Sequence, residues 1–235
     1  MTDRIDPIAS ADMRGIPARS AAPDPAPIAA VVFDVEGVIA HPAAAEADRR
    51  LGERWPGLTD AEVQRTRNRP DLYPLWEALS TGRLAHDAYW AAILAALGMP
   101  AAPRDVDAMI AIQRTTAWAC LDADVLAWAP RLRRRGVGVA LLSNSGPYHD
   151  DHLETFAGLY DVAHFSHRTG RRKPDRDAYA GVAAALGVAA AAIVFVDDKR
   201  RNIDAAEAAG MTGVPFESAA ALRASLAALG LADRR

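Results

Sequence analysis

The most regular hydrophobic pattern in this chain is a set of short apolar runs, each followed by a polar residue. Three such runs precede Asp34, Ser143 and Asp197, at residues 28–33, 137–142 and 193–196. A continuous apolar run of this length is typical of a strand that is buried on both faces. Weaker runs at residues 162–165 and 211–214 predict two further strands.

Helical patterns separate the later runs. They cover residues 122–135, 175–186 and 202–209, and each is closed by a glycine, at Gly136, Gly187 and Gly210. Strands that alternate with helices of this length form a parallel sheet with right-handed crossovers. The pattern therefore predicts an α/β fold.

Residues 43–118 interrupt this alternation, because they carry helix signals and no clear strand. Thr59 and Glu62 have the spacing of a capping box. Residues 84–97 and 105–116 place apolar side chains at helical intervals. We expect an all-helical insert over this segment.

Three parts of the chain follow from these patterns. The expected core consists of residues 28–42 and 119–235, and the helical insert at 43–118 lies between them. Residues 1–27 contain many alanines and prolines without periodicity, which predicts a disordered leader.

Composition excludes several classes of function. The chain has 235 residues, a net charge of −3 and no long run of basic residues, so we expect no nucleic-acid partner. It lacks an apolar stretch of about 18 residues, so we expect no membrane span. A single cysteine, Cys120, excludes an internal disulfide and is typical of the cytoplasm. A monomer and a homodimer both remain open.

Polar side chains follow the predicted strands where ligands bind in a parallel sheet. They are Asp34 and Glu36, Ser143 and Asn144, and Asp197 and Asp198. Carboxylates that converge on one crevice repel one another unless a cation lies between them. Because Mg²⁺ prefers oxygen ligands, the spacing predicts a magnesium site.

The same side chains suit phosphoryl transfer. A carboxylate attacks phosphorus to form an acyl phosphate, and cations and hydrogen-bond donors then neutralise the charge on the transferred group. Ser143 offers a hydroxyl, followed by backbone N–H groups at the start of the next predicted helix. Lys173 offers a positive charge, and Pro174 keeps it on a loop before the next helix.

Four segments resemble the four motifs of the haloacid dehalogenase superfamily, in the same order. They are Phe33–Val38, Leu141–Asn144, Arg172–Asp175, and Val194–Asp198 with Asn202. The resemblance covers about residues 28–230 and implies a Rossmann-like three-layer α/β/α core. The insert looks like the C1 cap of the subfamily that includes glucose-1-phosphate phosphatases and the phosphatase domain of soluble epoxide hydrolase.

The resemblance also implies a role for each site residue in a Mg²⁺-dependent phosphatase. Asp34 would be the nucleophile and a metal ligand. Glu36 would give its backbone carbonyl to Mg²⁺ and use its side chain as general acid and base. The other implied roles are phosphate binding by Ser143, Asn144 and Lys173, metal binding by Asp197 and Asp198, and support of the last loop by Asn202. The expected partner is a small phosphorylated metabolite, such as a sugar phosphate.

Glu36 departs from the phosphatase pattern, which has Asp at this position. The extra methylene moves the carboxyl group by about 1.5 Å, enough to lower the rate in a preorganised site. The enolase-phosphatases, however, also carry Glu in a similar segment. Three alternatives remain: a metal-free 2-haloacid dehalogenase, a phosphomutase, and a non-catalytic binder or regulator that senses a phosphorylated ligand.

Four histidines crowd one region of the sequence, at positions 149, 152, 164 and 167. No cysteine lies near them at a spacing typical of zinc sites. We therefore expect these histidines to belong to a polar surface.

Overall fold

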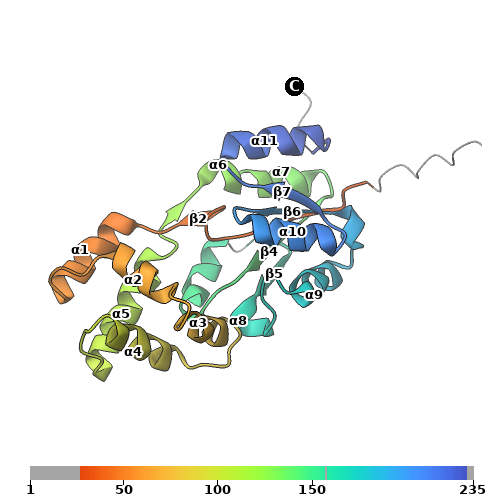
Figure 1. Cartoon of the computed structure of the whole chain (residues 1–235). Helices are drawn as coiled ribbons and strands as arrows, with labels where there is room; N and C mark the ends of the chain where they lie inside the picture. The colour runs from red at the N-terminus through yellow and green to blue at the C-terminus, as the bar shows by residue number, and fades with distance from the viewer. Residues whose placement is uncertain (1–26, 157, 232–235) are drawn as a thin grey trace, which may run out of the picture.

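The computed structural model describes residues 27–156 and 158–231, so the leader predicted for residues 1–27 lies almost wholly outside the described part. The described residues contain a five-stranded sheet in the order β5-β4-β1-β6-β7, with parallel pairing throughout (Figure 1). The strands are β1 (Ala30–Phe33), β4 (Gly138–Ser143), β5 (Val162–Phe165), β6 (Ile193–Asp197) and β7 (Thr212–Pro215). All five predicted strands are present, and the Rossmann-like fold is confirmed.

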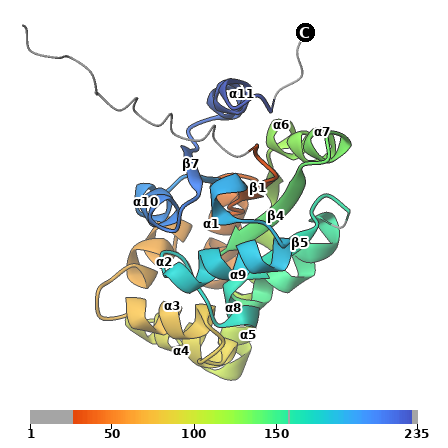
Figure 2. The ribbon, with the colours of Figure 1, turned by 90° about the vertical axis from the view of Figure 1, so that its right-hand side faces the viewer.

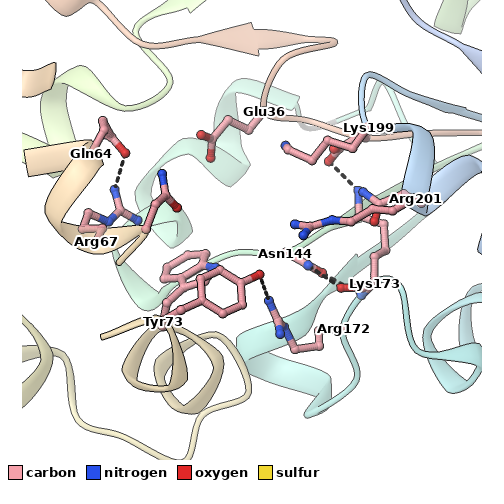
Figure 3. Close-up of a pocket in the computed structure, with 13 residues that line it drawn as sticks. Glu36, Gln64, Arg67, Tyr73, Asn144, Arg172, Lys173, Lys199 and Arg201 are labelled. Carbon is pink, nitrogen blue, oxygen red and sulfur yellow. Dashed lines mark hydrogen bonds and ion pairs between the residues drawn. The ribbon is translucent and has the colours of Figure 1, made fainter. Parts of the chain in front are cut away.

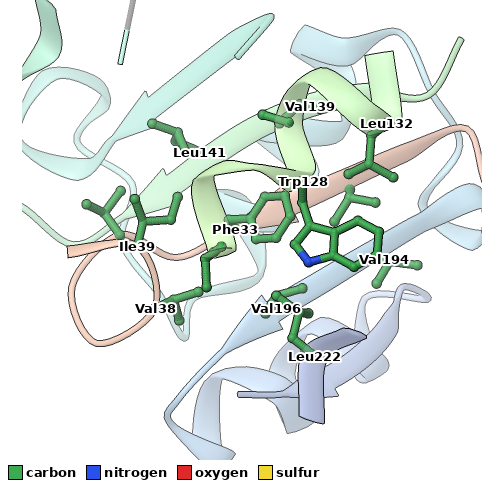
Figure 4. Close-up of a cluster of buried hydrophobic side chains, with 14 of the residues drawn as sticks. Phe33, Val38, Ile39, Trp128, Leu132, Val139, Leu141, Val194, Val196 and Leu222 are labelled. Carbon is green, nitrogen blue, oxygen red and sulfur yellow. The ribbon is translucent and has the colours of Figure 1, made fainter. Parts of the chain in front are cut away.

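Helices cover both faces of this sheet because neighbouring strand residues point to opposite sides (Figures 1 and 2). On one face, Phe33 and Val196 pack with Trp128 and Leu222 (Figure 4). The helices on this face are α6 (Ala123–Leu126), α7 (Trp128–Arg134) and α11 (Ala219–Ala228), and those on the other are α9 (Arg176–Leu186) and α10 (Arg200–Ala208).

The insert leaves the core through a two-stranded antiparallel ribbon of β2 (Ala40–His41) and β3 (Cys120–Leu121). Between these strands the described chain is helical, as predicted. The helices are α1 (Ala44–Arg54), α2 (Asp60–Arg67), α3 (Tyr73–Ser80), α4 (His86–Ala96) and α5 (Pro103–Thr116). They enclose a separate hydrophobic cluster that includes Leu51, Trp90 and Met109.

The predicted capping box is present at the start of α2. Thr59 Oγ1 accepts a hydrogen bond from the Glu62 backbone N–H at 3.3 Å, and the Glu62 carboxylate accepts one from the Thr59 N–H at 2.9 Å. These bonds satisfy two backbone donors that a helix start leaves free. They also fix the first turn of the helix whose other end reaches the pocket described below.

Two local predictions were wrong. The helix expected over residues 122–135 is divided at Ala127, because Pro130 has no N–H to donate to the carbonyl of Leu126. The segment after β4 is a 3₁₀ helix, η1 (Pro147–Phe156), and not the expected α-helix. Two further short elements are α8 (Ser166–Thr169) and the 3₁₀ turn η2 (Ala190–Ala192).

None of the described helices combines the length and the apolar character needed to cross a membrane.

Candidate active site

Three carboxylates meet at the carboxyl ends of the two central strands. Phe33 of β1 is in register with Val196 of β6, and the Asp34 N–H donates to the Val196 carbonyl at 2.8 Å. This pairing places Asp34 beside Asp197 and Asp198, and one oxygen from each of the three carboxylates lies within 4.8 Å of the others. The convergence predicted from the strand ends is therefore confirmed.

Lys173 lies between two of these carboxylates. Its Nζ is 2.8 Å from Asp34 Oδ1 and 2.7 Å from Asp197 Oδ2, and its side chain is only 1% exposed. A buried lysine in this position compensates two negative charges that would otherwise repel each other. The lysine thus makes it possible for both carboxylates to be buried here.

The side chain of Asn144 holds the backbone of Lys173. Asn144 Nδ2 donates to the Lys173 carbonyl at 2.7 Å, and Asn144 Oδ1 accepts from the Lys173 N–H at 2.8 Å. The paired bonds fix the loop that carries the lysine against the end of β4. The Asn144 side chain, which was predicted to contact phosphate, therefore holds the backbone of Lys173 in position.

Asp197 has both oxygens engaged within the protein. They accept hydrogen bonds from Lys173 Nζ, from the Lys199 N–H at 2.8 Å, and from Asn202 Nδ2 at 2.9 and 3.0 Å. Burial opposes ionisation of Asp197, but Lys173 and these hydrogen bonds outweigh it and lower its pKa. Asn202 therefore ties the start of α10 to the end of β6.

Asp34 behaves differently, although it shares the same lysine. Burial raises the pKa of Asp34 to about 7, and Lys173 only partly opposes that rise. Asp34 receives one backbone hydrogen bond, from the Val35 N–H at 2.6 Å, and no amide donor equivalent to Asn202 among the described residues. Fewer donors leave its charged form less stabilised than that of Asp197.

Asp198 is more open, with 32% of its side chain exposed and Lys199 Nζ at 3.4 Å. The loop after β1 lies directly against its carboxylate. Gly37 in that loop has a φ of 90°, and a Cβ on it would lie 2.7 Å from Asp198 Oδ2. Only glycine fits both the backbone conformation and the close approach, so Gly37 lets the loop and the carboxylate meet.

Ser143, at the end of β4, carries a buried hydroxyl with no hydrogen-bond partner in the described structure. The backbone N–H groups expected to form an anion site after it are partly occupied. The Ser145 N–H donates to Ser166 Oγ at 3.0 Å, and the Gly146 N–H donates to His149 Nδ1 at 3.1 Å. These two N–H groups are therefore engaged within the protein, whereas the Ser143 hydroxyl has no partner among the described residues.

A pocket of about 190 Å³ opens above these groups (Figure 3). Its floor includes Asp34, Lys173 and the exposed side chain of Glu36. The opposite wall comes from the insert and consists of Gln64, Arg67, Asn68, Tyr73 and Trp76. The sequence pattern did not predict this wall, since α2 gave no sign of which of its polar residues face the core.

Arg172, next to Lys173, joins the core to the insert. Its guanidinium forms a salt bridge with Glu77 of α3 and donates to the Tyr73 hydroxyl at 3.1 Å (Figure 3). Arg201 completes the pocket rim on the α10 side. The pocket is therefore enclosed by both parts of the chain.

For two of the four histidines, the prediction that they lie on a polar surface was wrong. His149 and His164 are buried, with 1% and 6% exposure. The His149 ring stacks on Trp118 with centroids 3.9 Å apart, and burial lowers the pKa of His149. Stacking on an apolar ring therefore allows a neutral histidine to be buried. The spacing of histidines along the chain does not reveal such a partner.

One of these histidines joins a serine and an aspartate in an order that resembles a hydrolytic triad. His167 Nδ1 is 2.8 Å from Ser145 Oγ, and its Nε2 is 2.8 Å from Asp150 Oδ1. The Ser145 hydroxyl is already engaged by His167, and none of these three residues lines the pocket. These bonds hold the loop after β4 in place.

Comparison with known proteins supports the resemblance of the four sequence motifs to the haloacid dehalogenase superfamily. The family of haloacid dehalogenase-like hydrolases matches residues 28–210. A sesquiterpene phosphatase of Aspergillus oryzae is 28% identical over 194 residues, which cover 79% of this chain and 88% of the relative. A flavin mononucleotide hydrolase of Arabidopsis thaliana is 40% identical over 62 residues, 26% of this chain and 25% of the relative.

Solved structures agree on the fold. A haloacid dehalogenase family enzyme of Bacteroides thetaiotaomicron, in complex with magnesium and inorganic phosphate, is 15% identical with a TM-score of 0.63, covering 81% of this chain and 94% of the other. An L-2-haloacid dehalogenase is 26% identical with a TM-score of 0.62, covering 80% of this chain and 85% of the other. From the matched residues and the shared fold, this chain belongs to the haloacid dehalogenase-like hydrolase family and is a hydrolase.

Proposed function

We propose that this hydrolase releases phosphate from a small phosphomonoester through an aspartyl-phosphate on Asp34. The observation that carries the proposal is the buried Asp34 carboxylate beside Lys173, in a pocket that also receives Glu36. The unpaired Ser143 hydroxyl offers a donor for a phosphoryl oxygen. Relatives named as a phosphatase and a flavin mononucleotide hydrolase add support.

The reaction has two steps. An Asp34 carboxylate oxygen attacks phosphorus, the bond from phosphorus to the ester oxygen breaks, and that oxygen takes a proton from the Glu36 carboxyl group. The Glu36 carboxylate then removes a proton from water, which attacks the phosphorus of the aspartyl-phosphate and releases Asp34 and inorganic phosphate. Lys173 and Ser143 hold the phosphoryl oxygens in both steps.

The donor set fits Mg²⁺. Asp34 and Asp198 would supply carboxylate oxygens to the ion, and the backbone carbonyl of Glu36, in the loop beside Asp198, would be a third hard ligand. Asp197 has both oxygens engaged by protein donors and would therefore act beside the ion. Bound Mg²⁺ would neutralise negative charge on the phosphoryl group. The relative that holds magnesium and phosphate supports this assignment.

We also propose that the insert acts as a C1-type cap. Its α2 and α3 supply one wall of the pocket, and the contact of Arg172 with Glu77 and Tyr73 ties it to the core. Side chains of a segment that closes over a site select the substrate.

Metal dependence is the first test. We expect phosphate release from a panel of phosphorylated metabolites and 4-nitrophenyl phosphate in Mg²⁺, its loss with EDTA, and its return when Mg²⁺ is added. Asp198→Asn should raise the Mg²⁺ concentration for half-maximal rate by about tenfold or more, because it removes a charged ligand. Asp204→Asn, at an exposed position on α10, is the matched control. Full activity in EDTA would contradict the metal assignment.

Glu36→Gln tests the acid/base role. We expect phosphate release to fall by about 10²-fold or more. The 4-nitrophenolate leaving group needs no proton, so the first step should survive and give a burst of 4-nitrophenol equal to the enzyme present. Glu217→Gln, at an exposed position, should give neither effect.

A burst is the outcome that a purely structural role of Glu36 would not produce. Glu36→Asp separates two further cases. A lower rate of phosphate release in Glu36→Asp than in wild type supports an active site adjusted to Glu. An inactive wild type that becomes active with Glu36→Asp supports a non-catalytic binder.

The dehalogenase-like neighbours give a second candidate function, hydrolysis of 2-haloacids on the same fold. The acidic Glu36 in the pocket does not favour it, because a carboxylate there repels an anionic haloacid. Halide release from 2-chloropropionate without added metal would support this alternative instead.

A further inference from the structure

Arg67 brings a positive charge into the pocket without an ion-pair partner in the described part of the chain, and the one acidic side chain that acts on it there, Glu36, does so across the pocket without a direct contact. Within the described residues, no carboxylate oxygen lies within 4.0 Å of its guanidinium. Its three hydrogen bonds go to neutral oxygens: Nε to the Tyr89 hydroxyl at 2.9 Å, Nη1 to Gln64 Oε1 at 3.3 Å, and Nη2 to the Tyr148 hydroxyl at 3.4 Å. A guanidinium has five N–H donors, so two remain for a ligand.

Aromatic rings fix this guanidinium in place. Its Cζ lies 5.1 Å from the ring centroid of Trp76, 5.3 Å from Trp90 and 5.9 Å from Tyr89. Such ring contacts favour a cation and restrict its motion. Burial raises the pKa of Tyr89 and of Tyr148, so both hydroxyls are neutral and do not replace a missing anion.

Three other cations of the pocket are each paired with a carboxylate. Lys173 contacts Asp34 and Asp197, Arg172 contacts Glu77, and Lys199 contacts Asp198. The positive charges of Lys173, Arg172 and Lys199 are thus compensated by carboxylates of the protein, and no ligand is needed to account for them. Arg201 also lines the pocket without an ion pair among the described residues, but unlike Arg67 it is exposed, on the α10 rim. Figure 3 shows Arg67 on the insert side of the pocket, across from Lys173. A charge held there faces the leaving group of an ester whose phosphorus lies at Asp34.

We infer that the leaving group of the substrate carries its own anionic group, a carboxylate or a second phosphate, which Arg67 binds. The planar fork of arginine matches the paired oxygens of either group. This inference rests on the proposed phosphatase function. A purely hydrocarbon leaving group would cover Arg67 and remove water from it without pairing its charge, which is unfavourable.

The test uses matched substrates with the full-length enzyme in Mg²⁺. One series consists of ω-carboxyalkyl phosphates of increasing chain length, a second of ω-hydroxyalkyl phosphates of the same lengths, and a third of ω-phosphoalkyl phosphates. We expect kcat/KM to favour an anionic substrate over its hydroxyl counterpart by about 30-fold or more at the best length. Comparison of the first and third series, whose leaving groups are anionic, distinguishes the carboxylate from the phosphate.

Arg67→Gln should remove this preference. Relative to wild type, kcat/KM for the anionic substrate should fall about 30-fold more than kcat/KM for its hydroxyl counterpart, mainly through a higher KM. Arg65→Gln removes one positive charge from an exposed position of the same helix and is the matched control. Arg67→Lys should recover part of the preference, since it restores the charge without the fork.

The outcomes separate the two proposals. Release of phosphate from all series at similar rates, or a preference that Arg67→Gln leaves intact, overturns the role of Arg67 alone. No release from any ester, including 4-nitrophenyl phosphate, overturns the phosphatase function itself. If Arg67→Gln does not fold, the wild-type enzyme and Arg67→Lys decide. Absence of the preference in wild type overturns the inference, and a preference that is reduced but not abolished in Arg67→Lys supports it.

Discussion

Asp34→Asn should reduce phosphate release by about 10⁴-fold or more, because an amide cannot attack phosphorus in place of the carboxylate. The amide has nearly the same shape and needs no cation beside it. Since burial already raises the pKa of Asp34 to about 7, neutralising it should leave the melting temperature unchanged or higher. We therefore expect Asp34→Asn to lose activity while its melting temperature is not lowered.

The covalent intermediate gives an independent measurement. Wild-type protein quenched in acid during turnover of a ³²P-labelled substrate should retain label that hydroxylamine removes, and Asp34→Asn should retain none. Asp105→Asn is a matched control, since Asp105 is a buried carboxylate of the insert that pairs with Arg54, away from the pocket. Label that persists in Asp34→Asn would exclude Asp34 as the nucleophile.

Lys173→Met should remove both activity and stability. The substitution leaves Asp34 and Asp197 buried side by side without the ammonium group that lies 2.8 and 2.7 Å from them. Breaking a buried ion pair from one side costs about 3–5 kcal/mol, so we expect a loss of unfolding free energy of this order in chemical denaturation. Phosphate release should fall about 10³-fold, because the charge that balances the phosphoryl group is gone.

Lys199 is the natural control, because it is the only other lysine of the chain and lies in the same pocket. Its side chain is 44% exposed, so Lys199→Met should change the unfolding free energy by less than about 1 kcal/mol. Adding Asp197→Asn to Lys173→Met should recover stability without recovering activity. A Lys173→Met variant as stable as wild type would show that the two carboxylates do not need the lysine.

The sheet and the carboxylate cluster were predictable because they depend on the order of residues along single strands. An apolar run ending at Asp34 and another ending at Asp197 fix both the strand and the edge at which the carboxylate appears. Parallel pairing then brings Asp34, Asp197 and Asp198 together whatever the details of the connecting helices.

The wall of the pocket could not be predicted in the same way. Arg67 is one of many arginines, and its position depends on how α2 packs against Trp90 of α4 and Tyr148 of the core. Contacts between segments far apart in the sequence also decided the burial of His149 on Trp118. Hydrophobic periodicity describes one element at a time and carries no information about such partners.

The scarcity of lysine gives this chain an experimental advantage. Its only two lysines, Lys173 and Lys199, both line the pocket. Reductive ¹³C-methylation should therefore place an NMR probe on the accessible Lys199 amine, besides the chain's α-amino group, while the buried Lys173 reacts slowly. Ligands and metal ions could then be titrated by following one side-chain resonance, without assigning the spectrum of the whole protein.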